Sequence, residues 1–124
     1  MTTLKMSSNR VIGGETVNNE NLSGLHLADG ATFFYRNGHE YDDIFPAWDW
    51  RIIPGVTSSL GNVSLRWPVA DLKRGSGFVG GVSDGVNGYA AMDFHCDNPR
   101  AKKSWFFFGD TEFFIPPPRP KPIF

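Results

Sequence analysis

Amides and carboxylates gather in one short loop of this 124-residue chain. Between the glycines of residues 13 to 24 lie Glu15, Asn18, Asn19, Glu20 and Asn21. Such side chains, held on a loop between strands, can hydrogen-bond the hydroxyls of a sugar or recognise an acidic sugar. Asn and Gly are also ordinary residues of solvated turns. Two interpretations of this loop therefore stay open, a sugar-binding site and a solvated turn, and composition favours the turn.

A second group of side chains suited to chemistry lies in residues 40 to 55, which combine large rings with acids. Tryptophans here and just beyond could stack on the apolar faces of sugar rings: Trp48, Trp50 and Trp67. Core packing is the alternative, and composition favours it because Trp buries a large area. The nearby acids could ligate calcium, although they lack EF-hand spacing, and capping or solvation is the alternative: Asp42, Asp43 and Asp49.

The histidines and the single cysteine offer little further chemistry. His95, Cys96 and Asp97 are adjacent, and neighbours on a strand point to opposite faces, so they do not easily converge on one metal ion. His26 and His39 flank expected turns and have no obvious catalytic partner. One cysteine excludes an internal disulfide. Apart from the calcium considered above, we expect no cofactor.

Composition argues against two classes of partner. Twelve Lys and Arg residues balance thirteen Asp and Glu residues, so the chain lacks the basic field on which many nucleic-acid-binding proteins depend. No apolar run approaches the length needed to span a membrane, and residues 1 to 10 lack the hydrophobic core of a secretion signal. We therefore expect neither nucleic acid nor a membrane as a partner.

Short strands are the elements that must position these side chains. No segment keeps a 3.6-residue apolar period over three turns without Gly or Pro. Turn dipeptides punctuate the apolar runs instead: Asp29-Gly30, Asn37-Gly38, Asp84-Gly85, Asn87-Gly88 and Gly109-Asp110. We predict an all-β fold, an antiparallel β-sandwich within residues 1–112, followed by a Pro-rich tail at residues 113–124.

Several motifs follow one another in the order and spacing of an enzyme family. The first are Glu15-Thr16-Val17-Asn18, Glu20-Asn21, Ala28-Asp29-Gly30-Ala31-Thr32, and Trp48-Asp49-Trp50 before Pro54-Gly55. "GGVSDGVNGYAAMDF" and "AKKSWFFFGD" come later in the chain. Over roughly residues 4 to 112 the chain resembles the family 8 polysaccharide lyases, the chondroitin, hyaluronan and xanthan lyases, and it resembles the chondroitin lyases most strongly.

The resemblance implies a fold and a reaction. These enzymes have an N-terminal helical toroid and then large antiparallel β domains, and the chain resembles the first part of the central β super-sandwich. They cleave by β-elimination next to a uronic acid, and the toroid carries most of the catalytic side chains. A Glu from the β domain supports those side chains, and Glu15 matches it. Asn18 matches a nearby cleft residue, and we group Asn21 and Trp48 with it as expected contacts of the substrate.

The resemblance also bears on calcium and on location. In chondroitin lyase relatives the acidic and aromatic run helps to build a calcium site, and Asp49 matches one ligand position. Arg51 stands where a further acid is expected, so we expect Asp49 not to hold calcium tightly. The family is secreted or periplasmic, but this chain shows no signal peptide, which leaves its location open.

We therefore expect a piece of a polysaccharide lyase that binds an acidic polysaccharide such as chondroitin and does not cleave it alone. A non-catalytic carbohydrate-binding module and a structural or oligomerising remnant without sugar binding are the alternatives. After Phe114 the resembling family continues into further strands, whereas this chain continues with "IPPPRPKPIF". We expect exposed sheet edges to pair with a second copy of the chain.

Overall fold

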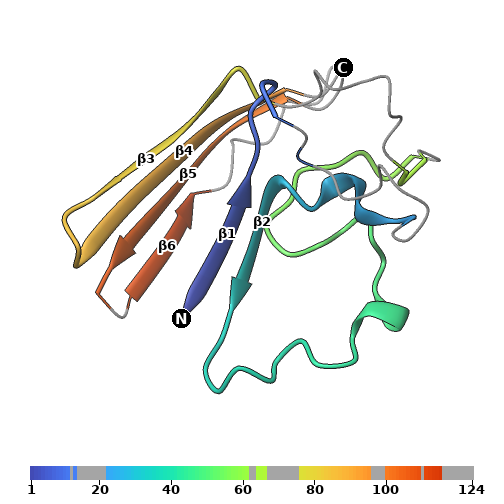
Figure 1. The fold of residues 1–124 in the computed structure, drawn as a ribbon, viewed down its shortest axis with the longest axis horizontal. Coiled ribbons are helices and arrows are strands. Elements are labelled where there is room, and N and C mark those ends of the chain that lie inside the picture. Colours follow the sequence, from blue (N-terminus) through green and yellow to red (C-terminus); the bar gives the residue numbers. More distant parts are fainter. Residues whose placement is uncertain are drawn as a thin grey trace, which may run out of the picture.

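Two antiparallel sheets face each other in the structure, which is a computed structural model (Figure 1). It describes residues 1–11, 13, 22–61, 64–66, 76–95, 100–109 and 111–115, the last five by their backbone alone. The smaller sheet pairs β1 (Thr2–Met6) with β2 (Asp29–Phe34). The larger sheet has four strands in chain order: β3 (Phe78–Ser83), β4 (Asn87–His95), β5 (Arg100–Phe108) and β6 (Thr111–Ile115).

Helix is confined to two single turns in the described part of the chain, η1 (Gly24–His26) and η2 (Phe45–Ala47). No helix among the described residues is long and apolar enough to cross a bilayer. Gly85, in the turn between β3 and β4, and Gly109, just after β5, take φ values of +93° and +53°, angles that favour glycine. The turn at Asp84-Gly85 is confirmed, while Asn87-Gly88 opens β4 and forms no separate turn.

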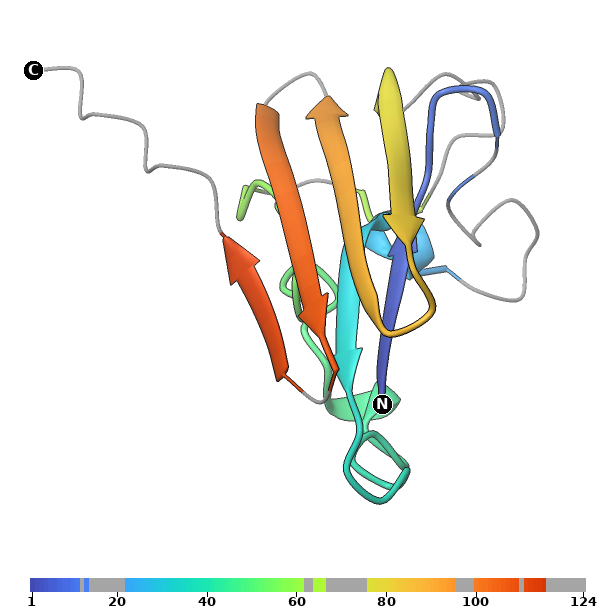
Figure 2. The ribbon, with the colours of Figure 1, turned by 90° about the vertical axis from the view of Figure 1, so that its left-hand side faces the viewer.

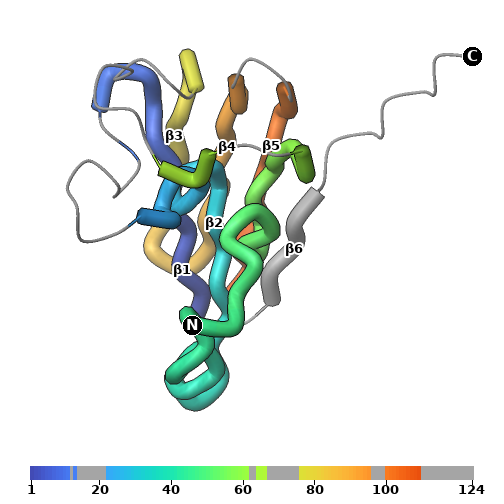
Figure 3. The backbone as a smooth tube through the Cα atoms, turned by 90° about the vertical axis from the view of Figure 1, so that its right-hand side faces the viewer, coloured from blue at the N-terminus to red at the C-terminus, as the bar shows by residue number. Residues whose placement is uncertain are grey.

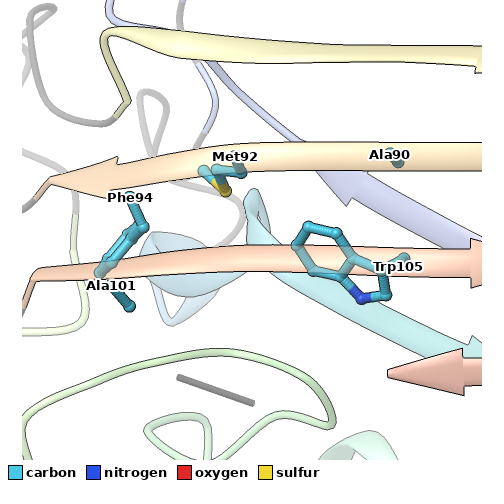
Figure 4. Close-up of a cluster of buried hydrophobic side chains, with 5 residues drawn as sticks. All are labelled: Ala90, Met92, Phe94, Ala101 and Trp105. Carbon is cyan, nitrogen blue, oxygen red and sulfur yellow. The ribbon is translucent and has the colours of Figure 1, made fainter. Parts of the chain in front are cut away.

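Side chains alternate along β4 and β5 between a buried and an exposed face, as a period of two requires. The buried side chains point towards β1 and β2, and five of them form the apolar core (Figure 4): Ala90, Met92, Phe94, Ala101 and Trp105. From the smaller sheet, Leu4 and Met6 pack against this core. The prediction of an all-β antiparallel sandwich is therefore confirmed.

The prediction of a turn at Asp29-Gly30 is wrong. Both residues belong to β2, and the single helical turn η1 lies just before them. Gly30 does take a positive φ of +88°, but it serves a close approach between the sheets. A Cβ at this position would lie 2.7 Å from Nζ of Lys103 and 2.9 Å from Cζ2 of Trp105. Gly30 thus lets β2 lie directly against β5.

The segment that follows β2 packs beside that strand, away from the larger sheet (Figures 1 and 3). The Asn37-Gly38 turn starts this segment, with Gly38 at φ +93°. Glu40 holds the turn, because its carboxylate accepts hydrogen bonds from the backbone N–H groups of Arg36 at 2.6 Å and Asn37 at 2.9 Å. The Asn37 bond is the main reason why the pKa of Glu40 falls to about 2.

Candidate functional site

The segment after β2 carries a cluster of rings, which we call the aromatic surface: Tyr35, Tyr41, Phe45, Trp48 and Trp50. Trp48 lies at its centre and stacks on Phe33 of β2, with 5.7 Å between ring centroids and 10° between planes. Phe45 contacts both Trp48 and Trp50 at 5.5 and 5.7 Å, and 57% of it is exposed. Trp48 is thus a half-buried support, and Phe45 is the ring most open to a ligand.

Asp49 and Arg51 form an ion pair at the end of the aromatic surface. Nε of Arg51 donates to Oδ1 of Asp49 at 2.8 Å, and Nη2 donates to Oδ2 at 2.7 Å. The backbone N–H of Arg51 donates to Oδ1 as well, at 3.1 Å. These contacts, led by the side-chain hydrogen bond, lower the pKa of Asp49 to about 2. Both carboxylate oxygens therefore face a cation that the chain itself supplies.

A buried polar cluster joins the two sheets, and sequence reasoning missed it. His26 lies at the end of η1 with only 4% of its surface exposed, and its Nδ1 hydrogen-bonds Oδ2 of Asp29 at 2.8 Å. Thr32 accepts a hydrogen bond from Nε1 of Trp105 at 3.0 Å and donates one to the carbonyl of Gly30 at 3.0 Å. These contacts satisfy polar groups that burial would otherwise penalise.

Lys103 of β5 is the most unusual member of this buried cluster, because only 1% of it is exposed. Its ammonium donates to the carbonyl of Asp29 at 2.8 Å and to the carbonyl of Gly55. It also lies 5.5 Å from the ring centroid of Trp105. Burial lowers the pKa of Lys103 from 10.5 to about 8, and the Asp29 carboxylate opposes this shift. The Lys103 ammonium therefore links the two sheets through its hydrogen bonds.

Comparison with known proteins decides the family. The profile of polysaccharide lyase family 8, super-sandwich domain, matches residues 1–115. The chain belongs to this family. It is 44% identical over 108 residues to a chondroitinase-AC from Pedobacter heparinus, and the match covers 85% of the chain and 15% of that relative. It is 32% identical over 117 residues to a hyaluronate lyase from Staphylococcus aureus, covering 90% of the chain and 14% of that relative.

A hyaluronate lyase from Thermasporomyces composti is similar too, at 29% identity over 119 residues, with 87% of the chain and 14% of the relative covered. The chain thus spans about one seventh of the length of these curated relatives. The resemblance seen in the sequence is confirmed as membership of the family.

Three motifs that carry the family resemblance meet at the buried polar cluster. "ADGAT" supplies Asp29, Gly30 and Thr32, "AKKSW" supplies Lys103 and Trp105, and the Pro54-Gly55 motif supplies the second carbonyl for Lys103. The backbone N–H of Thr32 also donates to the carbonyl of Pro54 at 2.9 Å. In this family 8 chain, these motifs therefore build the junction between the sheets.

Glu15, Asn18 and Asn21, expected to support catalysis or to touch substrate, lie outside the described residues, as do Trp67, Cys96 and Asp97. The structure therefore does not test their roles. His95 lies exposed at the end of β4. His39, for which the sequence offers no obvious catalytic partner, lies 2.8 Å from Oδ2 of Asp42 through its Nδ1, on an exposed turn. The His-x-x-Asp spacing, which His26 and Asp29 share, is the signal in the sequence that could have revealed both pairs.

The described acids do not fit a calcium ion, which prefers six or more oxygen ligands. Asp42 faces His39, and Asp49 is engaged by Arg51 at both oxygens. No group of three or more His, Cys, Asp or Glu side chains gathers as a metal site in the described part of the chain. The sequence interpretation in which Asp42, Asp43 and Asp49 share an ion thus gains no support from their positions.

We expect calcium titrated into the purified chain to show no binding at micromolar concentrations. The reason is that an ion at Asp49 would have to displace the Arg51 guanidinium from both oxygens. Isothermal titration calorimetry measures this, with Arg51→Ala as the variant that frees the carboxylate. Micromolar binding by the unaltered chain that disappears in Asp49→Ala would contradict the expectation.

Proposed function

We propose that the chain is the β-sandwich part of a polysaccharide lyase that acts by β-elimination on a uronic-acid-containing polysaccharide of the chondroitin or hyaluronan type. The observation that carries this proposal is the family match over residues 1–115. The names of the relatives, a chondroitinase-AC and two hyaluronate lyases, support the substrate class. The same proposal assigns a supporting role in catalysis to Glu15 and contacts with the substrate to Asn18 and Asn21.

Binding without turnover is the activity that we propose for the chain alone. β-Elimination needs a base for the proton beside the uronate carboxylate and an acid for the leaving oxygen. Among the described residues, two groups of suitable chemistry are withheld from the surface: His26 is paired with Asp29 in the interior, and Lys103 is buried between the sheets. In the described residues, neither group reaches a surface where a polysaccharide could lie.

The aromatic surface is the feature that supports sugar binding. Phe45 offers an exposed ring of the kind that packs on the apolar face of a sugar. Arg36 lies exposed in the same segment and supplies positive charge for a uronate or sulfate group. The alternative of a structural remnant rests on Trp48, whose ring is stacked on Phe33.

We expect the purified chain to bind chondroitin sulfate or hyaluronan without forming unsaturated uronate product. Ultraviolet absorbance of that product measures cleavage, and calorimetry with oligosaccharides measures binding. Phe45→Ala should weaken binding about tenfold, because it removes one exposed stacking ring. Ile52→Ala, which shortens another exposed apolar side chain, is the matched control and should leave binding unchanged.

Two results would contradict this proposal in different ways. Sustained product formation that Glu15→Ala abolishes would reveal a complete active site in the chain. Absence of binding to every acidic polysaccharide would favour the structural remnant.

Self-association is a further part of the proposal. β3 and β6 border the larger sheet, and each has one hydrogen-bonded neighbour among the described strands. Backbone groups along such borders can pair with another chain. We therefore retain the expectation that copies of the chain associate, and the sheet edges are one place where they can do so.

A further inference from the structure

The face of the larger sheet that points away from β1 and β2 is rich in apolar side chains, and we call it the outer face. Figure 2 views the molecule from this side, and no described segment crosses in front of the sheet. Near the β3–β4 turn it carries Val82, Tyr89 and Phe108, which are 70%, 38% and 50% exposed. Phe106 stacks on Phe108 with 9° between ring planes, and its centroid lies 4.9 Å from that of Tyr89. An exposed patch of this kind is typical of an interaction surface.

The apolar half of the outer face encloses a hollow of about 260 Å³ whose polar rim is already engaged. The Asp84 carboxylate accepts from the backbone N–H groups of Val86 at 2.9 Å and Asn87 at 2.6 Å. Oγ of Ser83 donates to the carbonyl of Asn87 at 2.7 Å. A sugar needs polar groups that are ready to bind its hydroxyls, and these groups hold the turn instead. The hollow therefore suits an apolar surface better than a sugar.

The other half of the outer face carries the charged residues Asp93 and Lys102 beside the exposed ring of Phe78, and the two charges are placed to suit a two-fold partner. Asp93 of β4 lies directly opposite Lys102 of β5 in the strand register, just as Tyr89 lies opposite Phe106. A two-fold axis that runs along the strands between β4 and β5 turns one copy face to face with another. It places β4 over the β5 of the second copy at the same height along the strands. Asp93 then lies over Lys102 of the partner subunit and Tyr89 lies over Phe106 of the partner subunit, while Phe108 lies over Asn87 of the partner subunit and His95 lies over Arg100 of the partner subunit.

We propose that the outer face binds a second copy of this chain about this two-fold axis. Tyr89 packs against Phe106 of the partner subunit, and Asp93 lies over Lys102 of the partner subunit. An axis across the strands would instead put the rings of one copy over the charged end of the other, which leaves charges against apolar surface. The inference rests on the self-association proposed above and specifies the surface that carries it.

The size of the outer face sets the strength of this dimer. With strands about 4.8 Å apart and about 3.4 Å per residue, strands of six, nine, nine and five residues give a face of about 470 Å². Two copies would then bury about 950 Å² in total, which is the size of a weak, reversible interface. We therefore expect a dimer that dissociates in the micromolar range.

Charge reversal tests the arrangement of the two copies. Sedimentation equilibrium of the full chain from about 1 µM to 1 mM gives the dissociation constant of each variant. Asp93→Lys puts a new ammonium over Lys102 of the partner subunit, and Lys102→Asp sets two carboxylates against each other, so each single variant should dimerise at least tenfold more weakly. The double variant restores both contacts and should return to within about threefold of the unaltered chain.

Two further variants separate the outer face from other modes of association. Tyr89→Ser removes one central ring and should weaken the dimer at least tenfold, whereas Leu60→Ser alters an apolar residue that is 68% exposed outside this face and should have no effect. Circular dichroism confirms that every variant is folded. If the charge-reversal variants dimerise as tightly as the unaltered chain, the outer face is not the interface and pairing of sheet edges is favoured. A monomer at all concentrations would overturn self-association itself, while leaving the sugar-binding proposal untouched.

Discussion

Gly30→Ala is expected to lower the free energy of unfolding by about 3 kcal/mol. Two costs add: an L-residue at φ +88° costs about 1–2 kcal/mol of backbone strain, and overpacking a tight core costs about 1–3 kcal/mol. The new methyl would lie 2.7 Å from Nζ of Lys103 and 2.9 Å from Cζ2 of Trp105, so β2 and β5 would have to move apart. Urea denaturation at neutral pH measures the change.

Gly38→Ala is the matched control for Gly30→Ala. Gly38 has nearly the same backbone angle, φ +93°, but open space around its Cα. This substitution carries only the backbone cost, so it should destabilise the chain by about 1 kcal/mol. If the two variants lose the same free energy of unfolding, the sheets can move apart at Gly30 without cost, which would contradict the close approach described above.

Lys103→Met is expected to abolish a gain in stability that the unaltered chain shows between about pH 8 and pH 10.5. In the folded chain burial lowers the pKa of Lys103 to about 8, while the unfolded chain keeps the ordinary value near 10.5. Below pH 8 the folded state carries the full cost of a buried ammonium. Between the two pKa values the unfolded chain binds more protons than the folded chain, so stability rises with pH.

The size of this gain follows from the shift of about 2.5 pKa units, which is worth about 3 kcal/mol. Denaturation curves at pH 7.5, 9 and 10.5 should show it as a difference between the unaltered chain and Lys103→Met, in which other titrations cancel. Met keeps a long side chain but no charge. Lys102→Met, which changes the exposed neighbour, should retain the pH dependence. Parallel curves for all three proteins would contradict an ammonium held between the sheets.

The sequence predicted the larger sheet well because its signals are local. Alternation along β4 and β5 and turns at Asp84-Gly85 and Gly109 specify hairpins without reference to the rest of the chain. Gly30 was wrongly predicted to lie in a turn, because glycine serves both tight turns and close packing. Only the position of β5 shows that this glycine serves packing. Local pattern alone could not separate them.

Candidate site residues were harder to predict for the same reason. Trp48 suits both a sugar and a core, and the ring on which it stacks is Phe33, fifteen residues earlier, a contact that local pattern does not show. Lys103 looks like a surface residue by type, although its place between Ala101 and Trp105 on an alternating strand predicts that it points inward. The carbonyls that receive it come from Asp29 and Gly55, and their approach depends on the whole fold.

Because Lys102 and Lys103 are adjacent in the chain, their side chains together can report how often the two sheets separate. One amine is exposed and the next is sealed between the sheets, so an amine-reactive reagent meets two sites of similar chemistry and opposite access. In the monomer the exposed amine of Lys102 is modified readily, whereas Lys103 is modified only during the moments when the sheets separate. The ratio of the two rates thus reads out the opening equilibrium of the sandwich, in the way that hydrogen exchange does for backbone amides.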